Sequence, residues 1–438
     1  MVSQVKGFSR LSKDEKINWL VSSHFLNQNI ARETLEKYWN TDEQLQLLHE
    51  EFSENTISNF YLPFSVAPNF VINKKIYTIP MTIEESSVVA AASKAAKFWS
   101  SRGGFKAEVI NTEKNGQVHF CYHGEFEKLR NFFIEVKPKL INGISSVQAN
   151  MQKRGGGVTD IILLDKTDQL PDYYQLHATF ETVDAMGANF INTCLETFAT
   201  ILKTEALNYN VFSEDEKEIE IIMSILSNYV PNCLVRAEVS CPIDELPSTP
   251  ELSAKAYAEK FVRAVAIAEK EPFRAVTHNK GIMNGVDAVV LATGNDFRAI
   301  EAGAHAYATK EGSYASLTHA SIENDYFKFY IEIPLALGTV GGLTSLHPMV
   351  KLALEILGKP SAKELMKVIA VAGLAQNFGA INSLITTGIQ KGHMKMHLMN
   401  ILNQQQATPQ EKSAVNEYFS KHEVTHSAVV SLLEELRS

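Results

Sequence analysis

Residues 274–305 combine ionisable side chains with glycines at a density that favours a close-packed chemical site over a solvated surface. A surface helix would carry few glycines, because each interior glycine costs about 1 kcal/mol relative to alanine. Lys280 offers a fixed positive charge for an oxygen that becomes negative during a reaction, unless it is an ordinary exposed lysine. Asp296 offers a carboxylate for proton handling or, more simply, the N-cap of the next helix.

Two adjacent acids, Glu84 and Glu85, precede a run of small residues that predicts a closely packed helix beginning near Glu85. Adjacent side chains point about 100° apart on a helix and to opposite faces of a strand, so only one of the two can face a given site. Either carboxylate could instead simply interact with the positive end of the helix dipole.

The segment DAMGAN at residues 184–189 opens a long predicted helix whose free amide groups suit a pyrophosphate. Asp184 stands just before that helix, Gly187 permits close approach of the backbone, and Asn189 and Asn192 add amide groups. The segment could equally be a cap followed by a packed helix. It lacks the GxGxxG pattern, so a Rossmann site is not expected.

The elements that position these residues follow from periodicity and caps. Ser12 and Glu15 form a capping box before one helix, and residues 31–51 predict a second. Residues 54–81 contain three prolines and predict irregular chain with short strands. At the other end, Thr408, Pro409 and Glu411 form a further capping box that opens two short amphipathic helices.

Between residues 105 and 229 the pattern changes to alternating strands and helices. Asn115 and Gly116 predict a two-residue hairpin between residues 106–111 and 117–122. A helix over 126–136, two strands, and a long helix over 186–207 follow. This order predicts a compact α+β unit inserted into a larger domain, whose own pattern resumes after Tyr229.

Composition narrows the class of protein. A chain of 438 residues is expected to form two or three domains, and the net charge of −9 argues against a general nucleic-acid binder. We find neither a signal peptide nor a long apolar run, so no membrane association is expected. Four scattered cysteines without a CxxC pair fit a reducing, cytoplasmic setting and predict no metal site.

Six motifs, taken together, resemble one enzyme family. They are ENTIS at Glu54, PMTIEESSVVAAAS from Pro80, DAMGAN from Asp184, HNKGIMNG with TGND over 278–296, GTVGG from Gly338, and GHM from Gly392. The chain is similar to the soluble bacterial class II form of 3-hydroxy-3-methylglutaryl-CoA (HMG-CoA) reductase. The resemblance implies an α+β fold with a large mixed α/β substrate domain, an inserted ferredoxin-like cofactor domain and a helical C-terminal flap.

The domain bounds we expect are 1–110 and 226–388 for the two parts of the large domain, 111–225 for the inserted domain and 389–438 for the flap. The activity implied is the four-electron reduction of HMG-CoA to mevalonate and CoA with two NAD(P)H, or the reverse oxidation, in the isoprenoid pathway. Such chemistry needs a positive charge for an oxyanion, a proton for the departing thiolate, and a proton donor for an aldehyde.

The resemblance assigns these tasks to four residues. Lys280 polarises the carbonyl, Glu85 rather than Glu84 donates a proton to the aldehyde, and Asp296 is expected to hydrogen-bond Lys280. His393, in the flap, protonates the thiolate, for which the ordinary pKa of histidine is suitable. The family often has proline or glycine after its catalytic glutamate, whereas this chain has Ser86.

The ligand-binding residues also follow from the resemblance. Arg274 would bind the carboxylate of the substrate as a planar fork, with Asn284 and Ser87 completing that side. The cofactor residues expected are Asp184, Met186, Gly187, Ala188, Asn189, Asn192, Lys153 and Arg154. The last two could meet a 2′-phosphate, and no aspartate in residues 145–154 would accept a ribose hydroxyl, so NADPH is favoured over NADH.

The partners implied are HMG-CoA, mevalonate and CoA, in a homodimer or a larger assembly of dimers, because the family builds its site across a dimer interface. Two alternatives differ in class. An acyl-CoA condensing enzyme or transferase would need a reactive nucleophile, which no cysteine here provides. A non-catalytic ligand-binding homologue would not need all four residue types that the chain retains.

Overall fold

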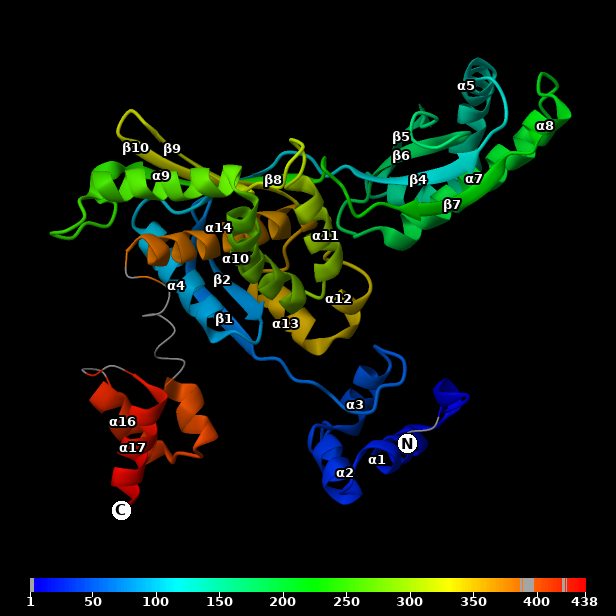
Figure 1. The fold of residues 1–438 in the computed structure, drawn as a ribbon. Coiled ribbons are helices and arrows are strands. Elements are labelled where there is room, and N and C mark those ends of the chain that lie inside the picture. Colours follow the sequence, from blue (N-terminus) through cyan, green and yellow to red (C-terminus); the bar gives the residue numbers. More distant parts are fainter. Residues whose placement is uncertain (1–3, 387, 389–397, 420–421, 423) are drawn as a thin grey trace. The chain divides into compact units, whose positions relative to one another are not determined.

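The computed structural model describes residues 4–386, 388, 398–419, 422 and 424–438 (Figure 1). Residues 1–63 form a unit of their own. It contains a short 3-10 helix, Phe8–Arg10, and three α-helices: α1 (Lys13–His24), α2 (Gln28–Lys37) and α3 (Glu43–Glu50). The predicted capping box of Ser12 and Glu15 is confirmed at the start of α1. The single helix expected over 31–51 is wrong, because the Asp42 carboxylate accepts from two amides and starts a new helix.

Residues 64–82 form one long hairpin, where the sequence had predicted irregular chain with short strands. Strand β1 (Phe64–Ile72) pairs with β2 (Lys75–Thr82), and Asn73 and Lys74 make the turn with φ of 48° and 69°. A left-handed pair of this kind matches the twist of the flanking strands. Pro68 falls at a shift of register between Ala67 and Phe70, where a missing amide donor does not break a ladder.

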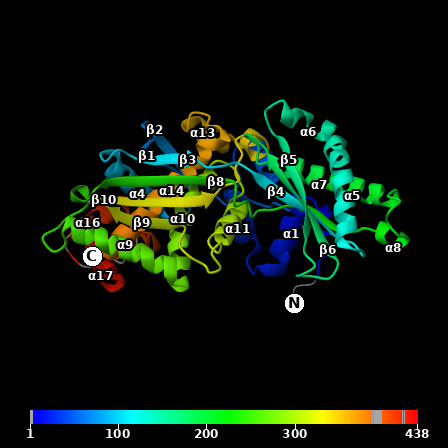
Figure 2. The same cartoon turned by 90° about the horizontal axis from the view of Figure 1, so that it is seen from above.

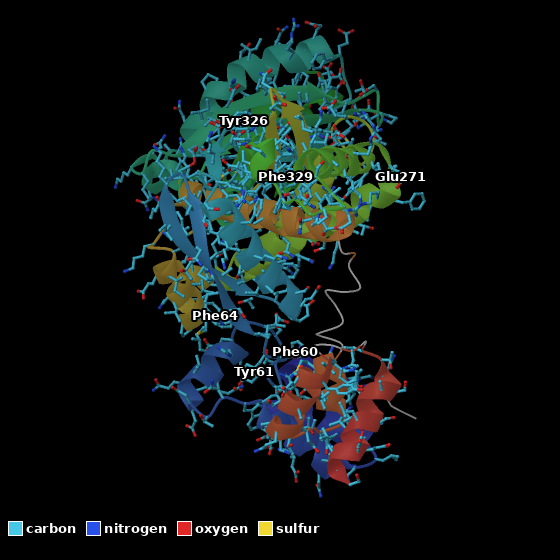
Figure 3. All side chains as sticks on the ribbon, turned by 90° about the vertical axis from the view of Figure 1, so that its left-hand side faces the viewer. Phe60, Tyr61, Phe64, Glu271, Tyr326 and Phe329 are labelled. Atoms are coloured by element: carbon cyan, nitrogen blue, oxygen red, sulfur yellow. The ribbon has the colours of Figure 1, made fainter. Side chains whose placement is uncertain are left out.

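The main core forms around a four-stranded antiparallel sheet in the order β3-β8-β10-β9 (Figure 2). Its strands are β3 (Lys106–Val109), β8 (Leu234–Pro242), β10 (Tyr326–Pro334) and β9 (Thr318–Glu323). The long helix α14 (Ala362–Ile385) packs on this sheet, and α4 (Ser86–Ser100), α9 (Ala254–Lys270) and α10 (Pro272–Ala292) pack on α14. Phe329 points from β10 into this core, whereas Tyr326 on the same strand is exposed (Figure 3).

The contact between α10 and α14 explains several of the glycines. A Cβ added at Gly285 would lie 2.5 Å from the carbonyl oxygen of Ala372, and one at Gly373 would lie 2.8 Å from the Val286 side chain. Glycine at these positions therefore allows the two helix backbones to approach closely. Helix α14 is long and apolar enough to cross a membrane, but 72% of its apolar window is buried inside the protein, as in a core helix.

A second sheet has the strand order β5-β6-β4-β7, with all neighbours antiparallel. Its strands are β4 (Lys114–Cys121), β5 (Gly157–Asp165), β6 (Tyr173–Glu181) and β7 (Glu220–Leu226). The helices α5 (Phe126–Gly143), α6 (Ser145–Gln152), α7 (Ala188–Leu207) and α8 (Glu214–Lys217) complete the unit. The order β-α-β-β-α-β is ferredoxin-like, and the predicted α+β class is confirmed.

The hairpin predicted at Asn115 and Gly116 is wrong. Strand β4 runs straight through both residues, and β3 belongs to the other sheet. Gly116 is needed for space rather than for a turn, because a Cβ there would lie 2.6 Å from the Leu195 side chain of α7. The glycine lets α7 pack closely on the sheet.

Shorter elements connect and complete these layers. They are a 3-10 turn, Ile243–Glu245, and helices α11 (Phe297–Tyr307), α12 (Leu343–Leu346) and α13 (Pro348–Ile356). The C-terminal residues form α16 (Pro409–Phe419) and α17 (His426–Arg437), as predicted. The capping box at Thr408 is present, with the Glu411 carboxylate 2.6 Å from the Thr408 amide nitrogen. Glu411 also pairs with Arg437 of α17.

Candidate functional site

Glu85 and Lys280 come together from segments nearly 200 positions apart. Glu85 occupies the turn between the end of β2 and the start of α4, and Lys280 lies in the middle of α10, which packs on β2. The Lys280 Nζ lies 3.7 Å from Glu85 Oε2, and their side chains are 65% and 32% exposed. Glu84 is exposed, and among the described residues the acid that pairs with Lys280 is Glu85. An ammonium and a carboxylate therefore lie next to each other at one solvent-exposed surface.

Ser87 extends this pair along α4. Its hydroxyl donates to the Glu85 carboxylate. Ser87, Ala91 and Phe98 share one face of the helix, because residues three and four apart are neighbours on a helix surface. Ala91 and Phe98 line a cleft of about 310 Å3 between α4 and the end of α14, in which apolar surface predominates. Lys94, Phe378 and Thr386 are also among its lining residues.

The first half of α10 holds Lys280 in place through buried polar contacts. His278 is buried, with its Nε2 2.6 Å from the Thr318 hydroxyl. Burial, with smaller effects of Arg274 and His319, lowers the pKa of His278 to about 3, so the ring is neutral at physiological pH. The Asn279 side chain bonds the backbone at Ala315 and Leu317. These two motif residues fix the helix rather than meet a ligand.

Arg274 and Asn284 lie on the same helix on either side of Lys280. Arg274 is half-buried, and burial lowers the pKa of its guanidinium. Within the part of the chain that the structure describes, neither side chain forms a hydrogen bond or ion pair with Lys280. Both groups are therefore available to a ligand.

Asp296 performs the simpler of its two predicted tasks. Its carboxylate accepts from the amides of Arg298 and Ala299 at 3.1 and 3.2 Å, capping α11, and it also pairs with the Arg298 guanidinium. The hydrogen bond expected between Asp296 and Lys280 is absent within the chain. The physical reason is the length of α10, which continues 12 residues beyond Lys280 and so rises about 18 Å before it ends.

Asp296 instead lies next to the DAMGAN loop. The neighbouring Asn295 accepts from the Gly338 amide at 2.8 Å, and a Cβ added at Gly338 would lie 2.4 Å from the Met186 nitrogen. One chain therefore carries two separate clusters. We call Glu85, Ser87 and Lys280 the carbonyl cluster, and Asp296, Asn295 and residues 182–189 the loop cluster.

The loop cluster contains a helix N-terminus without a side-chain cap. Gly187 is the N-cap of α7 with φ of 93°, and a Cβ there would lie 2.5 Å from the Thr182 side chain, so only glycine fits. Ala188 and Asn189 begin the helix, and Asn189 is exposed. The amides of this first turn suit an anionic group.

Two predicted cofactor residues have contacts within the protein. The Asp184 carboxylate accepts from the Ala362 amide at 2.7 Å, which fixes the loop to the start of α14. The Asn192 side-chain oxygen, Oδ1, accepts from the Leu226 amide at 2.9 Å, which holds β7 on α7. Both side chains therefore have structural roles that the sequence did not suggest.

Lys153 and Arg154 are exposed at the turn between α6 and β5. The turn lies beside the end of β6, since a Cβ added at Gly156 would be 2.5 Å from the Glu181 carbonyl oxygen. The two basic residues are thus close in the fold to the loop that begins at Thr182. His393, the predicted flap residue, lies outside the described residues.

Sequence reasoning missed two groups near these clusters. Lys114 is buried beneath the loop cluster, and only its place in a strand pattern could have singled it out. Asp287 lies two turns after Lys280, where burial and then a hydrogen bond to Glu301 raise the pKa of its carboxyl to about 8. Each of the helices α10 and α11 contains one acid, and the pairing of Asp287 with Glu301 depends on how the helices pack.

Comparisons with known proteins agree on one family. The family model described as hydroxymethylglutaryl-coenzyme A reductase matches residues 17–398. The chain is 35% identical to the 3-hydroxy-3-methylglutaryl-coenzyme A reductase of Archaeoglobus fulgidus, over 100% of this chain and 96% of that protein. It is 33% identical to a probable reductase of Borreliella burgdorferi, over 81% and 79%.

A solved structure of similar fold is the class II enzyme from Streptococcus pneumoniae bound to NADPH in open conformations. Its TM-score is 0.71 at 35% identity, covering 88% of this chain and 100% of that one. A second structure of the Streptococcus pneumoniae reductase gives a TM-score of 0.72 at 33% identity, with the same coverage.

Proposed function

Because the chain belongs to the hydroxymethylglutaryl-coenzyme A reductase family, we propose that Glu85, Lys280, Asp296 and His393 carry its reaction. The protein is an NAD(P)H-dependent oxidoreductase that reduces HMG-CoA in the mevalonate pathway. The observation that carries the residue assignment is the approach of Lys280 Nζ to 3.7 Å from Glu85 Oε2. An ammonium beside a carboxylate is what a carbonyl needs if it must gain negative charge and then a proton.

Lys280 would stabilise the oxygen of the substrate carbonyl. The Lys280 side chain is 65% exposed, so its charge is available to a ligand that displaces water around it. Closure of the site over the substrate would exclude water and strengthen this interaction. The rigid anchoring of α10 through His278 and Asn279 keeps the lysine backbone in one position.

Glu85 would hold the proton that the aldehyde oxygen receives. Its carboxylate is positioned by the Ser87 hydroxyl and by Lys280, from two different elements. Ser87 therefore acts on the orientation of Glu85 and could also meet the substrate. His393 would protonate the sulfur of CoA, so that the thiolate does not add back to the aldehyde.

The substrate would extend in two directions from this pair. The half-buried guanidinium of Arg274, with Asn284, offers donors to the carboxylate end. The apolar cleft along α4 begins on the same helix face as Ser87 and suits the pantetheine arm of CoA. Lys94 on its wall could interact with the negatively charged end of that arm.

The separation of the two clusters supports a homodimer with composite sites. About 18 Å of α10 keeps the loop cluster of a chain away from its own carbonyl cluster. A two-fold axis would bring the loop cluster of one copy to the carbonyl cluster of the other. The unit of residues 1–63 also exposes apolar side chains, among them Phe60, which is 89% exposed, and Tyr61 (Figure 3).

The loop cluster fits the phosphates of a nicotinamide cofactor. The uncapped start of α7, the left-handed Gly187 and the exposed Asn189 leave backbone donors accessible. When bound, the reduced nicotinamide supplies the hydride. Arg154 and Lys153, beside the end of β6, supply charge for a 2′-phosphate, which supports NADPH over NADH. In this division, residues 111–225 bind the cofactor and 389–438 form the flap.

The state of the cysteine thiols supports a proposal for the cellular compartment. All four cysteines are free, and three of them are buried. Burial raises the pKa of Cys194 to about 12, so its thiol is unreactive at physiological pH. Reduced, buried thiols fit a cytoplasmic enzyme.

The assignment is tested by following oxidation of NADPH with HMG-CoA or with mevaldehyde as substrate. Lys280→Ala should abolish both reactions while leaving the melting temperature unchanged, because the side chain is largely exposed. Lys270→Ala, an exposed lysine at the end of α9, serves as the control. His393→Gln should lose HMG-CoA reduction and retain mevaldehyde reduction in the presence of CoA. Full activity of Lys280→Ala, or equal loss of both half-reactions in His393→Gln, would contradict the assignment.

A further inference from the structure

Lys114 is a buried cation with an unusual set of partners. It is the first residue of β4, and only 5% of it is exposed. Its Nζ donates to the Thr182 hydroxyl at 2.5 Å, to the Ala185 carbonyl at 2.8 Å and, more weakly, to the Leu337 carbonyl at 3.5 Å. Among the described residues, no carboxylate lies within ion-pair distance of it.

A buried ammonium with only neutral partners is costly, and burial accordingly lowers the pKa of Lys114. Glu181, whose charge acts on Lys114 without an ion pair, uses its carboxylate on the Thr112 hydroxyl and the Val183 amide. An apolar side chain at this position would avoid the free-energy cost of burying a charge without a counter-charge. Stability alone therefore gives a weak reason for a lysine at this position.

Lys114 holds a strained segment. Val183 has a φ of 53°, which a β-branched residue rarely adopts and which costs of order 1–3 kcal/mol. Thr182 and Ala185 flank Val183, and both accept from Lys114. The Thr182 hydroxyl also donates to the Ala185 carbonyl at 2.7 Å, which closes a tight turn just before Gly187. The ammonium lies at the centre of this turn.

The third contact of Lys114 joins the turn to the segment after β10. Leu337 accepts from Lys114, the Gly338 amide donates to Asn295, and the Thr339 amide donates to the Asp184 carbonyl at 2.8 Å. Asn295 immediately precedes Asp296. A continuous set of hydrogen bonds thus runs from Lys114 to both the cofactor loop and the turn that carries Asp296.

We propose that Lys114 is a positioning residue for hydride transfer, which holds the loop of residues 182–187 and the Asp296 turn in one fixed relation. The proposal rests on the cofactor role proposed for the DAMGAN loop. Lys114 needs no contact with either ligand, because it acts through Thr182, Ala185 and Leu337. Loss of its ammonium would displace the nicotinamide relative to the carbonyl that it reduces.

The test replaces Lys114 by methionine, which keeps the length of the side chain and removes its donors. Lys114→Met should raise the KM for NADPH and lower kcat by about 10-fold to 100-fold, because small misplacements at a reacting centre are costly. The KM for HMG-CoA should stay within about twofold. With NADPH deuterated at the transferred position, the isotope effect on kcat should increase, since hydride transfer becomes slower than the other steps.

Lys128→Met is the matched control, because Lys128 is another lysine of the same sheet unit and pairs with Glu216 away from the loop. It should leave KM and the isotope effect unchanged even if the melting temperature falls. A Lys114→Met enzyme with wild-type KM and isotope effect overturns the proposal. So does a Lys128→Met enzyme with the same kinetic changes, because the changes would then reflect general loosening of the unit.

Two further variants keep the outcomes distinguishable. Asn189→Ala tests the loop itself: if it leaves the KM for NADPH unchanged, the cofactor role of the loop fails, and the role of Lys114 fails with it. If Asn189→Ala raises KM and Lys114→Met does not, only the Lys114 proposal fails. Should Lys114→Met not fold, Thr182→Val removes one acceptor without changing the shape, and a wild-type KM for this variant overturns the proposal.

Discussion

Mixing two inactive variants should restore activity if each site is shared between two chains. We consider Lys280→Ala, which damages the carbonyl cluster, and Asp296→Asn, which damages the loop cluster. Each homodimer should lack activity, since both of its sites miss one essential group. In a mixed dimer, one site receives both substitutions and the other receives neither.

The expected recovery follows from counting. Random association of equal amounts gives half mixed dimers, and each mixed dimer has one intact site out of two, so the mixture should regain roughly one quarter of wild-type activity. The structural reason is α10, whose length of about 18 Å beyond Lys280 prevents the two residues of one chain from meeting. If they acted within one chain, no mixed dimer would contain an intact site.

The assay is co-expression of the two variants with different affinity tags, followed by sequential purification of the mixed species and measurement of NADPH oxidation. The purified mixed dimer should have about half of wild-type activity per dimer. The control is a mixed dimer of one Lys280→Ala chain and one Glu85→Gln chain. Both residues belong to the carbonyl cluster, so every site in this dimer stays damaged. Recovery of activity in the control dimer would refute the composite site. So would a lack of recovery in the dimer of Lys280→Ala with Asp296→Asn.

Three other predictions concern single groups. Glu85→Gln should reduce the rate of mevaldehyde reduction by about 10²-fold to 10⁴-fold, whereas Glu84→Gln should not change it; steady-state rates that show the reverse would exclude Glu85 as the donor. Burial and Glu301 raise the pKa of Asp287 to about 8, so the native state retains a proton that the unfolded chain loses near pH 4. The free energy of unfolding should therefore fall as pH rises from about 4 to about 8, by less than about 1.4 kcal/mol per unit because the group is partly exposed. Urea titrations of Asp287→Asn should lack this slope, and an unchanged slope would point to another group. Arg154→Gln should lower kcat/KM for NADPH by roughly 10-fold and leave that for NADH unchanged, in contrast to an equal effect on both cofactors.

The elements that were predicted correctly are those whose boundaries depend on residues close together in the sequence. The capping boxes at Ser12 and Thr408 use side chains three residues apart, so the helix starts could be read directly. Two of the differences concern turn-forming residues in two environments. Asn115 and Gly116 resemble a turn, but α7 packs so closely on β4 that Gly116 is needed inside the strand. Asn73 and Lys74, which were not singled out, make the actual hairpin turn.

The sequence indicated candidate residues for the site but not their arrangement. The residue types at Glu85 and Lys280 indicated their chemistry, and their contact across two elements agrees with it. The distance between Asp296 and Lys280 depends on the number of residues in α10. No sequence motif gives that distance. Only its position in a strand pattern could have indicated Lys114, because its three acceptors are brought together by the junction of two sheets.

Helix α10 also fixes the angle, about its own axis, between Lys280 and the residues that follow the helix. One residue inserted between Lys280 and Ala292 would advance everything beyond it by about 1.5 Å and rotate it by roughly 100° about the helix axis. Gly285, in contact with Ala372, would lose its register against α14 at the same time. Insertions and deletions in this protein should therefore accumulate in its surface loops, while the count of residues from Lys280 to Asp296 stays constant even where the intervening side chains vary.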